Sequence, residues 1–264
     1  MIASYGLMDD EEIELDLAAL ELSELDHEGA DLSPYVTLLR DIAARLADTG
    51  ATAATPREQA EALAAVLAGE FGFAGDVDSY DAPLNADLIR VLDRRRGLPV
   101  SLSILYVAAA RRMGWTADAL NTPGHVLIRI GGEGGAIVDP FNGGRIVPPD
   151  RLAALLRRAV GAEDAARPDH VAAMSNRSVL VRLLLNQASR AEQGGDMKRA
   201  RTVYERMTIV APDHADAWWQ LARLQLQDGA VAEARRSLVS MLEVTRDPER
   251  RDLAVAALDA IAAR

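Results

Sequence analysis

Residues 99–113 read PVSLSILYVAAARRM, and this stretch decides the fold of the middle of the chain. Proline suits the first turn of a helix, so Pro99 predicts that a helix begins there. The residues that follow are apolar on almost every side of such a helix: Leu102, Ile104, Leu105, Val107, Ala108 and Ala109. A helix that is apolar all round is buried at the centre of a domain rather than on its surface. The sequence therefore predicts a buried central helix.

Downstream of Gly114 the pattern changes to short, mostly apolar runs at residues 116–120, 126–130 and 136–138. Turn-forming residues separate these runs, first Asn121-Thr122-Pro123-Gly124 and then the glycine-rich residues 131–135. This arrangement is typical of an antiparallel meander whose glycines form a hairpin turn. We expect a fourth strand at residues 145–147 and a helix at 149–160.

Upstream of the central helix we expect further helices at residues 10–26, 34–48, 56–71 and 85–96, with a loop at 72–83. Pro34 and Pro56 suit first helical turns, and Gly97 suits the end of the last of these helices. The predicted fold class is α+β, with a central buried helix, a small antiparallel sheet, N-terminal helices and an all-α C-terminal tail.

The tail contains an internal repeat with a period of 34 residues, in windows that start at Val181 and Ala215. Matching columns hold Ala188 with Ala222, Gly195 with Gly229, and Ala200 with Ala234. Small residues at these places let paired helices approach closely, and the period and pattern resemble the tetratricopeptide repeat. We expect residues 178–264 to form such repeats. They would either contact a protein partner or form a packed helical array without one.

The charge is concentrated at the start of the chain. The sequence has 40 acidic and 29 basic residues, for a net charge of −11, and residues 1–39 hold eleven acids with no Lys or Arg before Arg40. An acidic chain argues against non-specific nucleic-acid binding, which depends on basic contacts to phosphates. No run is long enough for a membrane span, and the acidic start lacks the basic region of a signal peptide, so we expect a cytoplasmic protein. The sequence predicts no particular oligomeric state.

Cofactor and metal sites are not expected. The four histidines, at positions 27, 125, 170 and 214, lack the spacing of a zinc site, and there is no phosphate loop or dinucleotide fingerprint. The chain has no cysteine, which excludes disulfides, thiolate metal sites and thiol nucleophiles.

One pair of residues can carry chemistry. His125 begins one expected strand and Asp139 ends the next, so a short glycine loop between antiparallel strands can bring them together. A carboxylate beside an imidazole fixes the imidazole tautomer and raises its basicity, which is the orienting half of a catalytic triad. A nucleophile at the start of a helix that faces this pair would gain from the helix dipole.

These segments carry a family resemblance. The residues Arg95-Arg96-Gly97-Leu98-Pro99-Val100-Ser101-Leu102-Ser103-Ile104-Leu105, Pro123-Gly124-His125 and Asp139-Pro140-Phe141-Asn142-Gly143-Gly144 resemble the transglutaminase-like core of a bacterial family. Its members often carry tetratricopeptide tails and include invasion-regulator-type proteins. The resemblance spans Asp31 to about Pro248. It implies a papain-like fold with a Cys-His-Asp triad in the active relatives, and domains at 1–30 (acidic segment), 31–165 (transglutaminase-like, with N-terminal helices) and 178–264 (repeats).

The sequence departs from the family at the nucleophile. The active relatives place cysteine about fifteen residues before the glycine that ends the central helix, and counting back from Gly114 reaches Pro99. His125 and Asp139 carry over from the resemblance, but the nucleophile does not. Ser101 is the nearest hydroxyl, and two residues correspond to roughly 200° around a helix, so it should point elsewhere unless the helix start is remodelled.

Three functions therefore remain open. The leading hypothesis is a catalytically inactive transglutaminase-like protein that acts as a protein-interaction or regulatory module through residues 178–264. The alternative is a serine-dependent hydrolase or acyltransferase, with Ser101 as nucleophile, His125 as general base and Asp139 as the residue that orients it. The third is a pocket around His125 that binds a peptide or a small molecule.

Overall fold

The central helix is present in the computed structural model, which describes residues 2–165 and 167–263. It is α5 (Pro99–Arg112), and every residue from Pro99 to Ala110 is buried. The helix packs against the N-terminal helices and against the sheet. The prediction of a buried central helix is confirmed, and only Arg111 and Arg112 in its last turn are exposed.

The sheet has four antiparallel strands in the order β3 (Ala117–Ala119), β4 (Ile128–Ile130), β5 (Ala136–Asp139) and β6 (Arg145–Ile146). Ile128 lies opposite Ala119 on one side and Val138 on the other. The turn between β4 and β5 needs glycine, because Gly131, Gly132 and Gly134 adopt positive φ angles. The expected meander, including its fourth strand, is confirmed.

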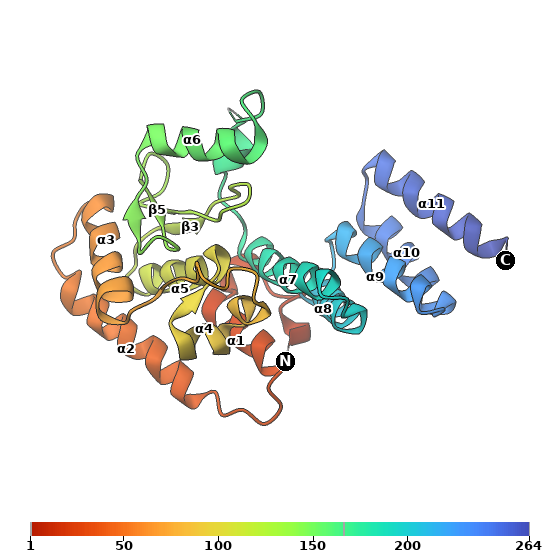
Figure 1. Ribbon diagram of the computed structural model, residues 1–264, viewed down its shortest axis with the longest axis horizontal. Coiled ribbons are helices and arrows are strands. Elements are labelled where there is room, and N and C mark those ends of the chain that lie inside the picture. The colour runs from red at the N-terminus through yellow and green to blue at the C-terminus, as the bar shows by residue number, and fades with distance from the viewer. Residues whose placement is uncertain (1, 166, 264) are drawn as a thin grey trace. The chain divides into compact units, whose positions relative to one another are not determined.

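The helices around this centre are α1 (Leu15–Glu24), α2 (Ser33–Thr49), α3 (Pro56–Leu63), α4 (Leu88–Arg94) and α6 (Pro149–Val160), as Figure 1 shows. A π-helical segment, η3 (Ala64–Glu70), continues α3. The 3-10 turns are η1 (Ile2–Ser4), η2 (Asp10–Glu12), η4 (Pro83–Ala86) and η5 (Pro168–Val171). Thr55 and Glu58 form a reciprocal capping box at the start of α3.

The helix expected at residues 85–96 is shorter than predicted. The Asp87 side chain caps α4 by accepting a hydrogen bond from the Arg90 amide, so the helix starts after η4. It ends at Arg94, because Arg95 adopts a left-handed φ of 58° and lies over the Phe73 ring. Gly97 therefore does not end the helix. It lies in β2 (Arg96–Gly97), which pairs in parallel with β1 (Ala74–Gly75). Strand β1 falls within residues 72–83, where a loop was expected.

The chain divides into two compact units. The core unit is Asp10–Val179, and the repeat unit runs from Leu180 onward together with the residues that precede Asp10. In the core unit, α1 buries Leu15, Leu20 and Leu22, and Asp16 pairs with Arg112.

The repeat unit is helical throughout its described residues. Its helices are α7, which begins in the core unit (Asn176–Gln193), α8 (Met197–Val210), α9 (Ala215–Gln227), α10 (Val231–Val244) and α11 (Pro248–Ala262). The small residues that define the repeat, Ala188, Ala200, Ala222 and Ala234, are all buried. Gly195 and Gly229 adopt positive φ at the two matching helix ends, where a side chain would strain the backbone.

No helix within residues 2–165 and 167–263 is long and apolar enough to cross a membrane.

Candidate functional site

His125 and Asp139 form a hydrogen-bonded pair beside the sheet. The register of β4 on β5 sets Ile128 opposite Val138, which brings the loop before β4 to the end of β5. His125 Nε2 lies 2.8 Å from Asp139 Oδ1. The His125 side chain is 20% exposed and that of Asp139 is 8% exposed, so the pair is only partly accessible to solvent. The expected closeness of the two residues is confirmed.

Asn142 holds the other side of the Asp139 carboxylate. Its backbone amide donates to Oδ1 at 3.2 Å and its side-chain amide donates to Oδ2 at 2.6 Å. Burial acts to raise the pKa of Asp139, but the hydrogen bonds and charge of His125 and the amides of Asn142 outweigh it, and the net shift is below the ordinary value. The carboxylate therefore stays ionised near neutral pH.

An ionised carboxylate only accepts hydrogen bonds, so it selects the tautomer of His125 that carries its proton on Nε2. The second ring nitrogen, Nδ1, is then an acceptor. No hydrogen bond to Nδ1 is present among the described residues. The pair can accept a proton or a hydrogen bond from a group outside the protein.

An aromatic wall lies next to the pair. The Phe141 ring packs edge-on against His125, with centroids 5.6 Å apart, and against Tyr80, with centroids 5.7 Å apart. Gly75 leaves room for this ring, since a Cβ at that position would lie 2.5 Å from Phe141. Sequence reasoning missed the packing of Phe141 on His125 and of Tyr80 on Phe141, because only the fold brings these three segments together.

Ser101 does not join the pair. It is fully buried, and its hydroxyl donates to the Asn85 carbonyl oxygen at 2.8 Å. In the described part of the chain no hydrogen bond connects Ser101 with His125 or Asp139.

A different side of α5 faces the Asp139 region. Pro99, Ser103 and Tyr106 recur at helical spacing and share one side. A Cβ at Gly144, in the turn after Asp139, would lie 2.8 Å from the Tyr106 hydroxyl. Burial and the charge of Asp139 raise the pKa of Tyr106, so its hydroxyl keeps its proton. Ser101 is roughly 200° around the helix from Pro99, which explains its separate environment.

A second His–Asp pair, His27 with Asp87, is structural. His27 Nε2 lies 2.6 Å from Oδ2 of Asp87, whose other oxygen caps α4. Within residues 2–165 and 167–263 no group of three or more His, Asp or Glu side chains could hold a metal ion.

Comparison with known proteins agrees with the predicted fold. The family model described as the transglutaminase-like superfamily matches residues 33–185. The chain belongs to the transglutaminase-like superfamily. A tetratricopeptide-repeat model matches residues 191–258, so this superfamily member carries a repeat tail, as the sequence predicted.

Relatives of the transglutaminase-like chain come from bacteria and animals. A UPF0162 protein of Xylella fastidiosa (strain 9a5c) is 30% identical over 246 residues, which cover 91% of this chain and 87% of that protein. A UPF0162 protein of Pseudomonas aeruginosa is 32% identical over 181 residues, or 67% of this chain and 64% of that protein. F-box only protein 21 of Homo sapiens is 37% identical over 83 residues, or 31% of this chain and 13% of that protein.

The position expected of the superfamily nucleophile is taken by Pro99. Proline is the first residue of α5, it is buried, and it has neither a nucleophilic atom nor a backbone N–H. The structure thus combines a His–Asp pair with a helix start that offers no thiol or hydroxyl at the expected place.

Proposed function

We propose that this transglutaminase-like protein is catalytically inactive and acts as a protein-interaction or regulatory module through residues 178–264. The observation that carries the proposal is the missing nucleophile. The chain contains no cysteine, Pro99 stands at the expected position, and the hydroxyl of Ser101 is bonded to Asn85. The net charge of −11 favours a protein partner over a nucleic acid.

Adjacent tryptophans on α9 support an interaction surface. The indole N–H of Trp218 donates to the Pro212 carbonyl oxygen at 2.8 Å, so this side chain is fixed within the repeat. Trp219 is partly buried against the same helical cluster, and its indole N–H has no hydrogen-bond partner among the described residues. Tryptophan with an unused donor is a frequent anchor of protein interfaces.

The test is a pair of variants in the full chain. A partner captured by crosslinking is purified, and its affinity is measured for the wild type, Trp219→Ala and Val239→Ala. Val239 is an exposed apolar residue of α10 and serves as the matched control. We expect Trp219→Ala to weaken binding by about tenfold or more and Val239→Ala to leave it unchanged. Equal affinity of the Trp219 variant and the wild type would remove α9 from the proposal.

A pocket around His125 is the second candidate. It is favoured by the unused Nδ1 of a partly exposed histidine whose tautomer Asp139 fixes. Titration with a panel of short peptides and small amides, followed through the His125 ring signals by NMR, tests this function. Signals that move with one ligand and stay fixed in Asp139→Asn would support the pocket. Signals that stay fixed across the whole panel would refute it.

The serine enzyme is the least supported of the three functions. It needs the Ser101 hydroxyl beside His125, whereas that hydroxyl is buried and donates elsewhere.

A further inference from the structure

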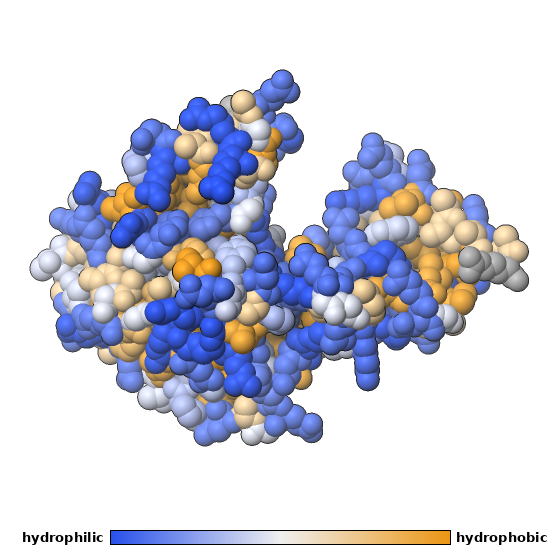
Figure 2. Space-filling model, in the orientation of Figure 1, coloured by the Kyte–Doolittle hydropathy of each residue, from blue (hydrophilic) through white to orange (hydrophobic). Residues whose placement is uncertain are grey.

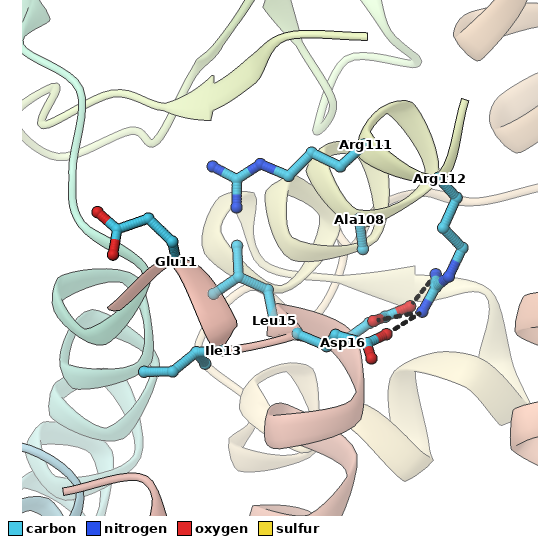
Figure 3. A pocket seen from close by; sticks show the side chains of 8 residues that line it. Glu11, Ile13, Leu15, Asp16, Ala108, Arg111 and Arg112 are labelled. Carbon is cyan, nitrogen blue, oxygen red and sulfur yellow. Dashed lines mark hydrogen bonds and ion pairs between the residues drawn. The ribbon is translucent and has the colours of Figure 1, made fainter. Parts of the chain in front are cut away.

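A hollow of about 250 Å³ lies in the core unit, between the N-terminal acidic segment and the end of α5 (Figure 3). It is lined by Glu11, Ile13, Glu14, Leu15, Asp16, Ala108, Arg111 and Arg112. Its floor is apolar, since Ile13, Leu15 and Ala108 are buried and together present hydrocarbon to the space. The hollow is distinct from the His125–Asp139 pair and independent of the function proposed above.

Arg111 is held in one orientation at the edge of the hollow. Its Nε donates to the Ala117 carbonyl oxygen at 2.9 Å, Nη1 donates to Asn176 Oδ1 at 2.6 Å, and Nη2 donates to Asp118 Oδ1 at 3.1 Å. A guanidinium group has five N–H donors in a fixed plane, so two donors, one on each Nη, are left over. Figure 3 shows Arg111 reaching from α5 over Leu15.

The Asn176 contact is itself fixed. Asp10 caps the start of α7 by accepting hydrogen bonds from the amides of Asn176 and Arg177 at 2.7 and 2.8 Å. The Asn176 side-chain amide donates to the Asp10 carbonyl oxygen at 2.8 Å. Arg111 is therefore pre-organised by a network that a ligand does not have to build.

Of the other charged side chains around the hollow, some are paired with each other and one is not. Arg112 pairs with both carboxylate oxygens of Asp16, at 2.5 and 2.9 Å, and lies 3.5 Å from Glu14. Glu11 lies on the side toward which Arg111 extends (Figure 3), and its carboxylate has no ion pair or hydrogen bond within the described residues. The hollow thus offers unused N–H donors and one unpaired carboxylate above an apolar floor.

We propose that this hollow binds a small aliphatic amino acid. The apolar side chain of the ligand lies on Ile13, Leu15 and Ala108, its carboxylate accepts hydrogen bonds from the two remaining donors of Arg111, and its ammonium group pairs with Glu11. A volume of about 250 Å³ is below the roughly 300–1,000 Å³ of sites for drug-sized ligands, which suits a molecule of this size.

The experiment titrates the full chain with L-leucine and follows the backbone amides of Leu15 and Ala108 by NMR. We expect these signals to shift with saturation at millimolar leucine. 4-Methylpentanoate, which is leucine without the amine, and isopentylamine, which is leucine without the carboxylate, should each bind about tenfold more weakly or worse, because each loses one charge-assisted contact.

Variants at the rim separate the two charged contacts. Glu11→Gln should weaken leucine binding by about tenfold and should not weaken the binding of 4-methylpentanoate, which has no ammonium group to pair with Glu11. Glu12→Gln is the matched control, since Glu12 is exposed and does not line the hollow, and should bind as the wild type does. Arg111 is not varied, because it also holds Asn176 and Asp118.

Three results would each overturn the proposal: no shift at any leucine concentration, isopentylamine or 4-methylpentanoate binding as tightly as leucine, or leucine binding that is the same in Glu11→Gln and in the wild type.

Discussion

The hydroxyl of Ser101 and the carbonyl oxygen of Asn85 share a buried hydrogen bond of 2.8 Å. It ties the first turn of α5 to the turn η4 that precedes α4. Because its hydroxyl makes this bond, Ser101, two residues after the expected nucleophile position, has a structural role in the core unit.

Ser101→Ala should therefore lower the free energy of unfolding by about 0.5–1.5 kcal/mol, because it removes this hydrogen bond while the Leu98 amide still donates to the Asn85 carbonyl oxygen at 3.2 Å. Ser103 provides a matched control on the same helix. It is equally buried, but its hydroxyl has no hydrogen-bond partner among the described residues, so Ser103→Ala should be neutral or stabilising. Urea unfolding of both variants measures the difference. Loss of an ester-hydrolase activity in Ser101→Ala with unchanged stability would instead support the serine enzyme.

The pair at the end of β5 predicts a dependence of stability on pH. The pKa of Asp139 is lower in the folded chain than its ordinary value, so the unfolded chain binds a proton first as the pH falls. The stabilisation from the carboxylate is complete above about pH 4 and is lost as the pH falls through the folded pKa. In Asp139→Asn this loss should be absent. Unfolding free energies measured between neutral pH and pH 3 should thus converge for the two proteins at the acidic end, and a constant gap would contradict the assignment.

The contact between Gly75 and Phe141 predicts a steric effect. In Gly75→Ala the new methyl group would lie 2.5 Å from the Phe141 ring, so we expect a loss of about 1–3 kcal/mol and altered ring signals for His125. Gly69→Ala is the control, because its nearest neighbour would be 3.8 Å away and its backbone suits alanine. That variant should be neutral or more stable by about 0.4–1 kcal/mol. Thermal unfolding of both checks the prediction, which fails if Gly75→Ala is as stable as the wild type.

Close packing in the repeat unit gives the last prediction. Ala234 of α10 is completely buried, so Ala234→Leu should overpack the helix pair and cost about 1–3 kcal/mol. Ala232 lies on the same helix but is exposed, and Ala232→Leu should be within about 0.5 kcal/mol of the wild type. Denaturant unfolding of the two variants compares the sites directly. Equal stabilities would mean that the small residue at this repeat position has no packing role.

Strong local patterns explain the parts of the fold that the sequence predicts well. The apolar run of α5, the glycines between β4 and β5, and the small residues of the repeat each act through neighbours in the chain. The shortening of α4 depends instead on the Asp87 cap and on Arg95 lying over Phe73. The burial of α1 depends on Arg112, which neutralises Asp16 from the far end of α5. Such partners come from distant segments, so the local sequence does not reveal them.

The candidate site also contains residues that the sequence predicts and residues that only the fold reveals. The predicted strand order identifies His125 and Asp139 as candidate site residues. Ser101 is a candidate only because it is near Pro99 in the sequence. Through tertiary packing, Phe141 contacts His125, Tyr80 contacts Phe141, and Tyr106 lies close enough to Asp139 to feel its charge. A signal for Tyr106 was present, since it lies seven residues after Pro99 and thus on the same side of the helix.

Pro99 has a consequence for the proposed inactivity. A nucleophile at the first position of a helix commonly uses its own backbone amide to stabilise the negative oxygen of the reaction intermediate. Pro99 supplies neither that amide nor a nucleophilic side chain, so under the proposed inactivity one residue accounts for the absence of both. By contrast, His125, Asp139 and Asn142 stand in a hydrogen-bonded arrangement beside the sheet.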